Sequence, residues 1–197
     1  MIKKGFVSGM MLGTFLLGAC VAETGKNTLI EASLTDREEA ILAGSEDAFV
    51  FDFNVDGTYS EVELRMERYD FGKVADSPAF LISINLEGEG SIVFTSSHLI
   101  DQEDALFTTS VSSGDLIGTH QTVETIFRDG ADGMAKISQT HLKPEVPIEG
   151  DMVLATILYS SKDTMSSLPD GYTDDPKDYQ KYLEEYDVAY VLKSIFR

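Results

Sequence analysis

The chain has 197 residues, and its 34 Asp and Glu residues against 15 Lys and Arg residues give a formal charge of −19. Its content of 43% hydrophobic and 10% aromatic residues is typical of a globular domain and excludes a disordered chain. The acid excess also excludes the basic surface with which proteins neutralise nucleic-acid phosphates, so neither DNA nor RNA is an expected partner.

The first 20 residues have the pattern of a secretory signal. Two lysines are followed by the uncharged run Gly5–Ala19, which is too short to span a bilayer as a helix. Residues 17–20 read Leu-Gly-Ala-Cys and resemble the lipobox of bacterial lipoproteins. The resemblance implies that Cys20 carries a diacylglyceryl group and becomes the first residue after cleavage.

Cys20 is the only cysteine, so the sequence excludes a disulfide within the chain and a cysteine-type zinc site. We therefore expect a signal peptide over 1–19, a lipidated cysteine and tether over 20–28, and a single domain over 29–197. Cleavage removes two lysines and no acid, leaving 13 basic and 34 acidic residues and a formal charge of −21. The expected location is the extracytoplasmic face of the cell membrane, with the lipid as anchor.

A short helix is predicted near the start of the domain. Thr35 or Asp36 can cap it, because their side-chain oxygens accept hydrogen bonds from the first backbone N–H groups. Glu38 suits the positive end of the helix dipole, and Gly44 is the predicted stop after Ala43.

The residues that follow have the two-residue period of half-buried strands. Apolar and polar side chains alternate over 49–55 and over 61–67. Further strands are predicted at Ala79–Glu87, Ser91–Thr95, Ala105–Ser110, His120–Arg128, Met152–Ser160 and Val188–Phe196. A second helix is predicted from Pro176 to Glu185, because Asp175 can cap it and proline suits its first position. These elements predict an all-β protein, an antiparallel two-sheet sandwich of immunoglobulin-like or jelly-roll type, with a short N-terminal helix and a helical insertion near the C-terminus.

The sequence VELRMERYDFGKV at residues 62–74, the late tyrosine-rich helix and the final apolar strand resemble small uncharacterised lipoproteins of Gram-positive bacteria. The resemblance implies a lipid anchor and supplies no activity. Only the lipidation site at Cys20 carries over to a named residue.

The segment from residue 52 to residue 63 fits the calcium-loop pattern D-x-[DN]-x-[DN]-G-x5-E and resembles an EF-hand loop. The calcium ligands that it specifies are Asp52, Asn54, Asp56 and Glu63. The flanking residues alternate with period two rather than forming helices. A β-hairpin with its turn at Asp56-Gly57 is therefore favoured over calcium binding.

Other candidate residues have simpler structural interpretations. Asp170, Asp174, Asp175 and Asp178 form an acidic cluster that offers a cation site, although a solvated helix cap is favoured. His98, His120 and His141 lack zinc-site spacing. Tyr172, Tyr179, Tyr182, Tyr186 and Tyr190 offer an aromatic platform for sugars or peptides, but cover for the core is favoured.

Common motifs of nucleophilic catalysis and nucleotide binding do not occur in the sequence. We therefore expect a non-catalytic binding or adaptor module, anchored to the membrane by its lipid, with no cofactor. A calcium-binding module and a hydrolase with paired carboxylates remain as alternatives. The negative charge favours a cationic peptide or a basic protein as partner, although the same charge also serves solubility alone.

Overall fold

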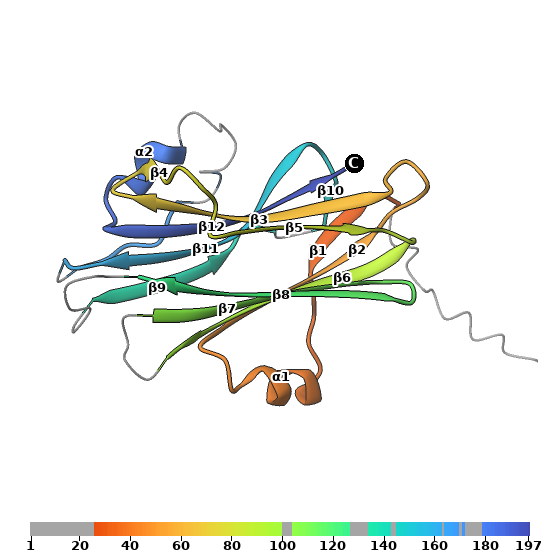
Figure 1. The fold of residues 1–197 in the computed structure, drawn as a ribbon, viewed down its shortest axis with the longest axis horizontal. Helices are drawn as coiled ribbons and strands as arrows, with labels where there is room; N and C mark the ends of the chain where they lie inside the picture. The colour runs from red at the N-terminus through yellow and green to blue at the C-terminus, as the bar shows by residue number, and fades with distance from the viewer. Residues whose placement is uncertain are drawn as a thin grey trace, which may run out of the picture.

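The computed structural model describes residues 26–99, 104–126, 134–142, 145–162, 164–169, 171 and 179–197. Within these ranges the chain forms two antiparallel sheets and two short helices (Figure 1). The predicted all-β sandwich is confirmed. Cys20 and the signal segment lie outside the described residues, as do Tyr172 and all four aspartates of the 170–178 cluster.

The two sheets have different strand orders. The first, sheet A, has the order β10-β1-β2-β6-β7-β8. Its strands are β1 (Thr28–Glu31), β2 (Asp47–Asn54), β6 (Glu89–His98), β7 (Asp104–Ser113), β8 (Leu116–Thr125) and β10 (Val146–Pro147). The second, sheet B, has the order β4-β3-β12-β11-β9, with β5 also paired to β3. Its strands are β3 (Glu61–Asp70), β4 (Lys73–Val74), β5 (Phe80–Asn85), β9 (Ala135–Thr140), β11 (Asp151–Ser160) and β12 (Val188–Phe196).

Alternation along the strands builds the core between the sheets. On β2 the buried residues include Phe49, Phe51 and Phe53, whereas the residues between them are partly or fully exposed. On β3 the same alternation buries Leu64 and Met66. Each sheet therefore presents one apolar face to the other, as a sandwich requires.

The predicted hairpin between residues 52 and 63 is wrong, although both strands and the turn between them are present. Thr58 N donates to Asp56 Oδ1 at 2.9 Å, and the turn residues are Gly57 and Thr58, one position later than predicted. However, β2 pairs with β1 and β6 in sheet A, whereas β3 pairs with β4, β5 and β12 in sheet B. The apolar faces of both strands must point into one core, so the chain crosses from one sheet to the other at this turn.

Polar contacts join the sheets at both sides of the sandwich. Asp47 on β2 accepts a hydrogen bond from Ser138 Oγ at 2.6 Å and lies 2.5 Å from Lys136 Nζ, both residues being on β9. Arg68 on β3 donates to the carbonyl oxygen of Thr125, the last residue of β8, at 2.7 Å. These contacts satisfy polar groups at the edges of the core and fix the sheets relative to each other.

The two helices lie on opposite sides of the molecule (Figure 1). Helix α1 (Asp36–Leu42) is capped by Thr35. The Thr35 hydroxyl accepts from Glu38 N, and Glu38 Oε2 accepts from Thr35 N, so the predicted cap is confirmed. Helix α2 (Tyr179–Leu183) lies over sheet B and ends two residues before the predicted Glu185, whereas its predicted start at Pro176 lies outside the described residues. Neither helix is long and apolar enough to cross a membrane.

Candidate functional site

A cavity of about 370 Å³ opens on the outer face of sheet A, and we call it the acidic pocket. Its lining includes three carboxylates, Asp52, Glu89 and Glu145, together with the polar side chains of Thr28, Asn54 and Ser91. No lysine or arginine is among the described residues that line it. The pocket is therefore a region of negative potential in a chain that is already strongly negative.

Strand register brings these side chains together. In the pairing of β1, β2 and β6, Asn54 stands opposite Thr28 on one side and Glu89 on the other. Asp52 stands opposite Ser91 in the next row on the same face. Ser91 Oγ donates to Asp52 Oδ1 at 2.6 Å, and Asn54 Nδ2 lies 3.4 Å from Glu89 Oε1. Two rows of side chains thus form the floor of the pocket.

Glu145 completes the wall from the segment just before β10. Its Oε1 atom is buried and has no hydrogen-bond partner among the described residues. A buried carboxylate oxygen without a donor is costly, because burial removes the water that would otherwise solvate it. Among the described residues, therefore, no donor reaches this oxygen, and an ammonium or guanidinium group would supply one.

An apolar groove adjoins the acidic pocket, and we call it the α1 groove. It has a volume of about 260 Å³ and lies between α1 and the outer face of sheet A. Its apolar lining comprises Ala32, Leu34, Ile41, Leu42, Val50 and Val93. Helix α1 buries none of its own residues, and Ile41 is 69% exposed.

The structure does not bring the four predicted calcium ligands together. Asp52 and Asn54 line the acidic pocket, whereas the Asp56 carboxylate accepts from the backbone N–H of Thr58 at its own turn. Glu63 lies on sheet B, where Oε2 pairs with Arg197 at 2.8 Å. No group of three or more His, Cys, Asp or Glu side chains in the described part of the chain is arranged to hold a metal ion.

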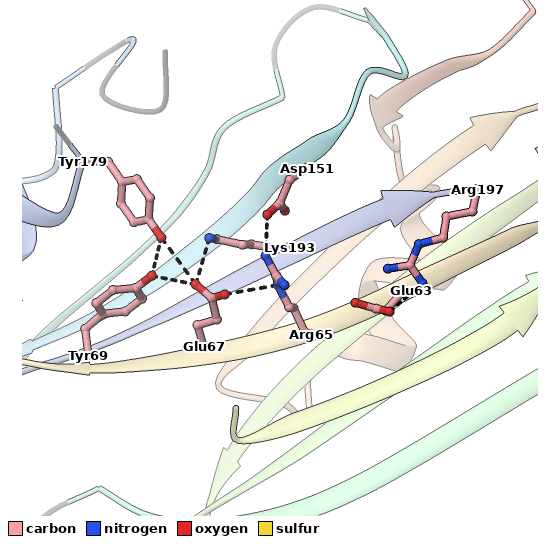
Figure 2. A network of polar contacts seen from close by, with 8 residues as sticks. All are labelled: Glu63, Arg65, Glu67, Tyr69, Asp151, Tyr179, Lys193 and Arg197. Carbon is pink, nitrogen blue, oxygen red and sulfur yellow. Dashed lines mark hydrogen bonds and ion pairs between the residues drawn. The ribbon is translucent and has the colours of Figure 1, made fainter. Parts of the chain in front are cut away.

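A second polar constellation lies on the outer face of sheet B (Figure 2). Glu67 on β3 is at its centre: Oε2 lies 2.8 Å from Lys193 Nζ and accepts from the Tyr69 hydroxyl at 2.6 Å. Tyr69 also bonds to the hydroxyl of Tyr179 on α2. Arg65 pairs with the other oxygen of Glu67 and with Asp151 on β11. The network connects α2 to sheet B and leaves Glu67 surrounded by donors.

Protonation states in this network favour a structural role. Burial of Glu67 opposes its ionisation, but hydrogen bonds from Lys193 and Tyr69 outweigh burial and hold its pKa below the ordinary value. Burial, with hydrogen bonds to Glu67 and Tyr179, raises the pKa of Tyr69 well above the ordinary value. Glu67 is therefore an ionised acceptor and Tyr69 a neutral donor, which is the arrangement that stabilises a fixed contact.

The candidate tyrosines and histidines are dispersed over the fold. Tyr179 and Tyr186 are buried in a cluster beneath α2, and Tyr190 lies in the main core, so cover for the core is their observed role. Of the described tyrosines in the C-terminal segment, Tyr182 is the one with substantial exposure, at 42%. His98, His120 and His141 lie on β6, on β8 and just after β9 respectively.

A family model described as the YgaN domain matches residues 28–196. The chain belongs to the YgaN domain family. No curated protein and no solved structure matches the chain. The matched YgaN region begins with β1 and ends with β12, so it includes both sheets, the acidic pocket and the network on sheet B.

Sequence reasoning identified Asp52 and Asn54 but missed their neighbours in the pocket. Glu89 lies outside the predicted strands, and Glu145 lies beside the two-residue strand β10, which was not predicted. Which acids share a face depends on the pairing of β1 with β2 and of β2 with β6, and the periodicity of one strand does not contain that information.

Proposed function

We propose that this protein is a lipid-anchored, non-catalytic binding module on the extracytoplasmic face of a bacterial cell membrane, and that its acidic pocket binds a cationic group of a peptide or basic protein. The observation that carries the proposal is the acidic pocket, which combines three carboxylates with no described basic residue in its lining. A lysine or arginine side chain would supply a positive charge and donors, which none of the described lining residues supplies as a basic group.

The anchor is proposed from the lipobox resemblance at residues 17–20. A chain with a formal charge of −21 after cleavage is repelled by anionic lipid headgroups, so the acyl chains at Cys20 would have to hold it at the membrane. The segment from Cys20 to Thr28 would then separate the membrane from β1.

The net charge also supports a cationic partner. Negative potential over the surface accelerates the approach of a positive ligand, and the acceleration weakens as salt screens it over a Debye length of about 8 Å at physiological ionic strength. The association rate of a cationic partner is therefore expected to fall as salt concentration rises.

Binding of a fluorescently labelled trilysine peptide to the full chain in nanodiscs of a zwitterionic phospholipid tests the pocket. We expect saturable binding and an increase in Kd of about tenfold for Glu145→Gln, because that change removes a charge-assisted hydrogen bond. Glu149→Gln is the matched control, because it removes the same charge from an exposed residue outside the pocket. Equal effects of both variants, or no binding of trilysine, would contradict the proposed site.

Fractionation of bacterial cells that express the chain tests the anchor. Cys20→Ala is expected to abolish membrane association or to leave an unprocessed precursor. Cys20→Ser is the conservative variant and is expected to behave in the same way, since a hydroxyl cannot form the thioether. Normal processing and normal membrane association of Cys20→Ala would contradict the anchor.

A further inference from the structure

The acidic pocket and the α1 groove are contiguous. Asp52 and Ser91 belong to the lining of both cavities, so they form a shared wall between a negative compartment and an apolar one. The two compartments have volumes of about 370 and 260 Å³. A single ligand that reaches across this wall would place a polar part on one side and an apolar part on the other.

The α1 groove exposes apolar surface that the protein itself leaves uncovered. Ile41 and Leu42 line it from α1, and Val50 and Val93 line it from the sheet. Ile41 is 69% exposed, and no residue of α1 is buried. An apolar surface of this kind is stabilised when an aliphatic side chain displaces the water on it.

Charge selects among the possible occupants of this surface. Asp52, Glu89 and Glu145 border the groove or lie in the adjoining pocket, and Glu145 Oε1 is buried with no hydrogen-bond partner among the described residues. A second copy of the chain carries the same strong negative charge, formally −21 after cleavage, and would be repelled. A partner with a positive group beside an aliphatic group matches both compartments.

Resting on the proposed function, we propose that the ligand is a peptide segment of a partner protein in which a lysine or arginine directly adjoins a large aliphatic residue. The basic side chain enters the acidic pocket toward Glu145, and the aliphatic side chain lies in the α1 groove against Ile41. Asp52, at the shared wall, faces the backbone between the two side chains.

Three labelled hexapeptides test this inference against the full chain in zwitterionic nanodiscs. They have the sequences Gly-Gly-Lys-Leu-Gly-Gly, Gly-Gly-Lys-Ser-Gly-Gly and Gly-Gly-Ser-Leu-Gly-Gly, and fluorescence anisotropy measures their binding. We expect the Lys-Leu peptide to bind at least about tenfold more tightly than the Lys-Ser peptide, because a leucine side chain becomes buried. The Ser-Leu peptide is expected to bind weakest, since it lacks the cation.

A comparison of two single variants, each tested with two peptides, locates the aliphatic contact. Ile41→Ser is expected to weaken binding of the Lys-Leu peptide by about fourfold or more and to leave the Lys-Ser peptide unchanged. Ile117→Ser is the matched control: Ile117 is 78% exposed on β8 and lies outside both cavities. Both variants alter exposed side chains, so both are expected to fold.

The outcomes separate this inference from the proposed function. Equal affinities of the Lys-Leu and Lys-Ser peptides, with weaker binding to Glu145→Gln, would overturn the role of the α1 groove and leave the acidic pocket as a cation site. Equal affinities of the Lys-Leu and Ser-Leu peptides would show that the site binds an aliphatic side chain without needing a positive charge beside it. That result would overturn the inference. Absence of binding by all three peptides would overturn both proposals.

Discussion

Lys193 Nζ lies 2.8 Å from Glu67 Oε2 on the outer face of sheet B, and the two side chains are only 9% and 16% exposed. Loss of either partner leaves the other charge with little water to solvate it. We expect Glu67→Gln to lower the free energy of unfolding by about 2 to 3 kcal/mol, measured by urea denaturation. A Glu67→Gln/Lys193→Met double variant is expected to lose less than the sum of the two single variants.

An exposed ion pair on the same face provides the control for the buried Glu67 pair. Arg197 Nη1 lies 3.7 Å from Glu61 Oε1, and these side chains are 54% and 37% exposed. Water and side-chain entropy offset most of the attraction in such a pair, so Glu61→Gln is expected to change stability by less than about 1 kcal/mol. A loss as large as that of Glu67→Gln would show that net charge, rather than burial of the Glu67 pair, sets the effect.

His141 gives the fold a specific pH dependence. Burial lowers the pKa of this imidazole to about 4 from an ordinary value of 6.5. The folded state therefore binds fewer protons than the unfolded state between these values, and stability is complete above about pH 6.5 and is lost as pH falls toward 4. Over that window the contribution of His141 amounts to about 3 kcal/mol at most.

Comparison with His141→Gln isolates this contribution from that of the acids. The urea midpoint of each protein is measured between pH 7 and pH 4. As pH falls, the midpoint of the natural chain is expected to fall more steeply than that of His141→Gln. Glutamine cannot be protonated, and its side chain retains a polar group near Thr156, whose Oγ1 lies 3.2 Å from His141 Nε2. Parallel curves for the two proteins would contradict a depressed pKa at His141.

Leu183 is the last residue of α2 and is completely buried, in a cluster with Tyr69, Leu158 and Val191. Leu183→Ala is expected to destabilise the protein by about 2 to 5 kcal/mol, because it leaves a cavity in addition to the lost burial. Hydrogen exchange is expected to accelerate first at the amides of α2. Tyr182→Ala is the control on the same helix, since Tyr182 is 42% exposed.

Sequence periodicity was sufficient for the sandwich but not for its connections. Val188–Phe196 was predicted at its observed bounds because seven of its nine residues are apolar. The strand Ala135–Thr140 was missed, because its residues read as polar and all six are only partly buried. The hairpin was wrong because an Asp-Gly turn between alternating strands has the same local sequence whether the strands pair or separate into two sheets.

The acidic pocket illustrates the corresponding limit for sites. The calcium-loop pattern placed Asp52 and Glu63 in one site, because it treats the chain as one continuous loop. In the structure these residues lie in different sheets, and the acidic neighbours of Asp52, Glu89 and Glu145, come from segments about 40 and 90 residues later in the chain. Only strand register determines which acids meet, and register is a property of the whole sandwich.

Gly90 lies on β6 opposite Phe53, at the floor of the acidic pocket. A Cβ atom at this position would lie 2.1 Å from the carbonyl oxygen of Ser112 and 2.3 Å from the ring of Phe53. The backbone oxygen belongs to the adjacent strand and cannot move without breaking the sheet, so Gly90→Ala is expected to cost about 3 kcal/mol. Gly44→Ala is the control, because no atom lies within 4 Å of its added Cβ. Thermal unfolding is expected to show a lower Tm for Gly90→Ala and an unchanged or slightly higher Tm for Gly44→Ala. A normal Tm for Gly90→Ala would contradict the close approach of β6 and β7.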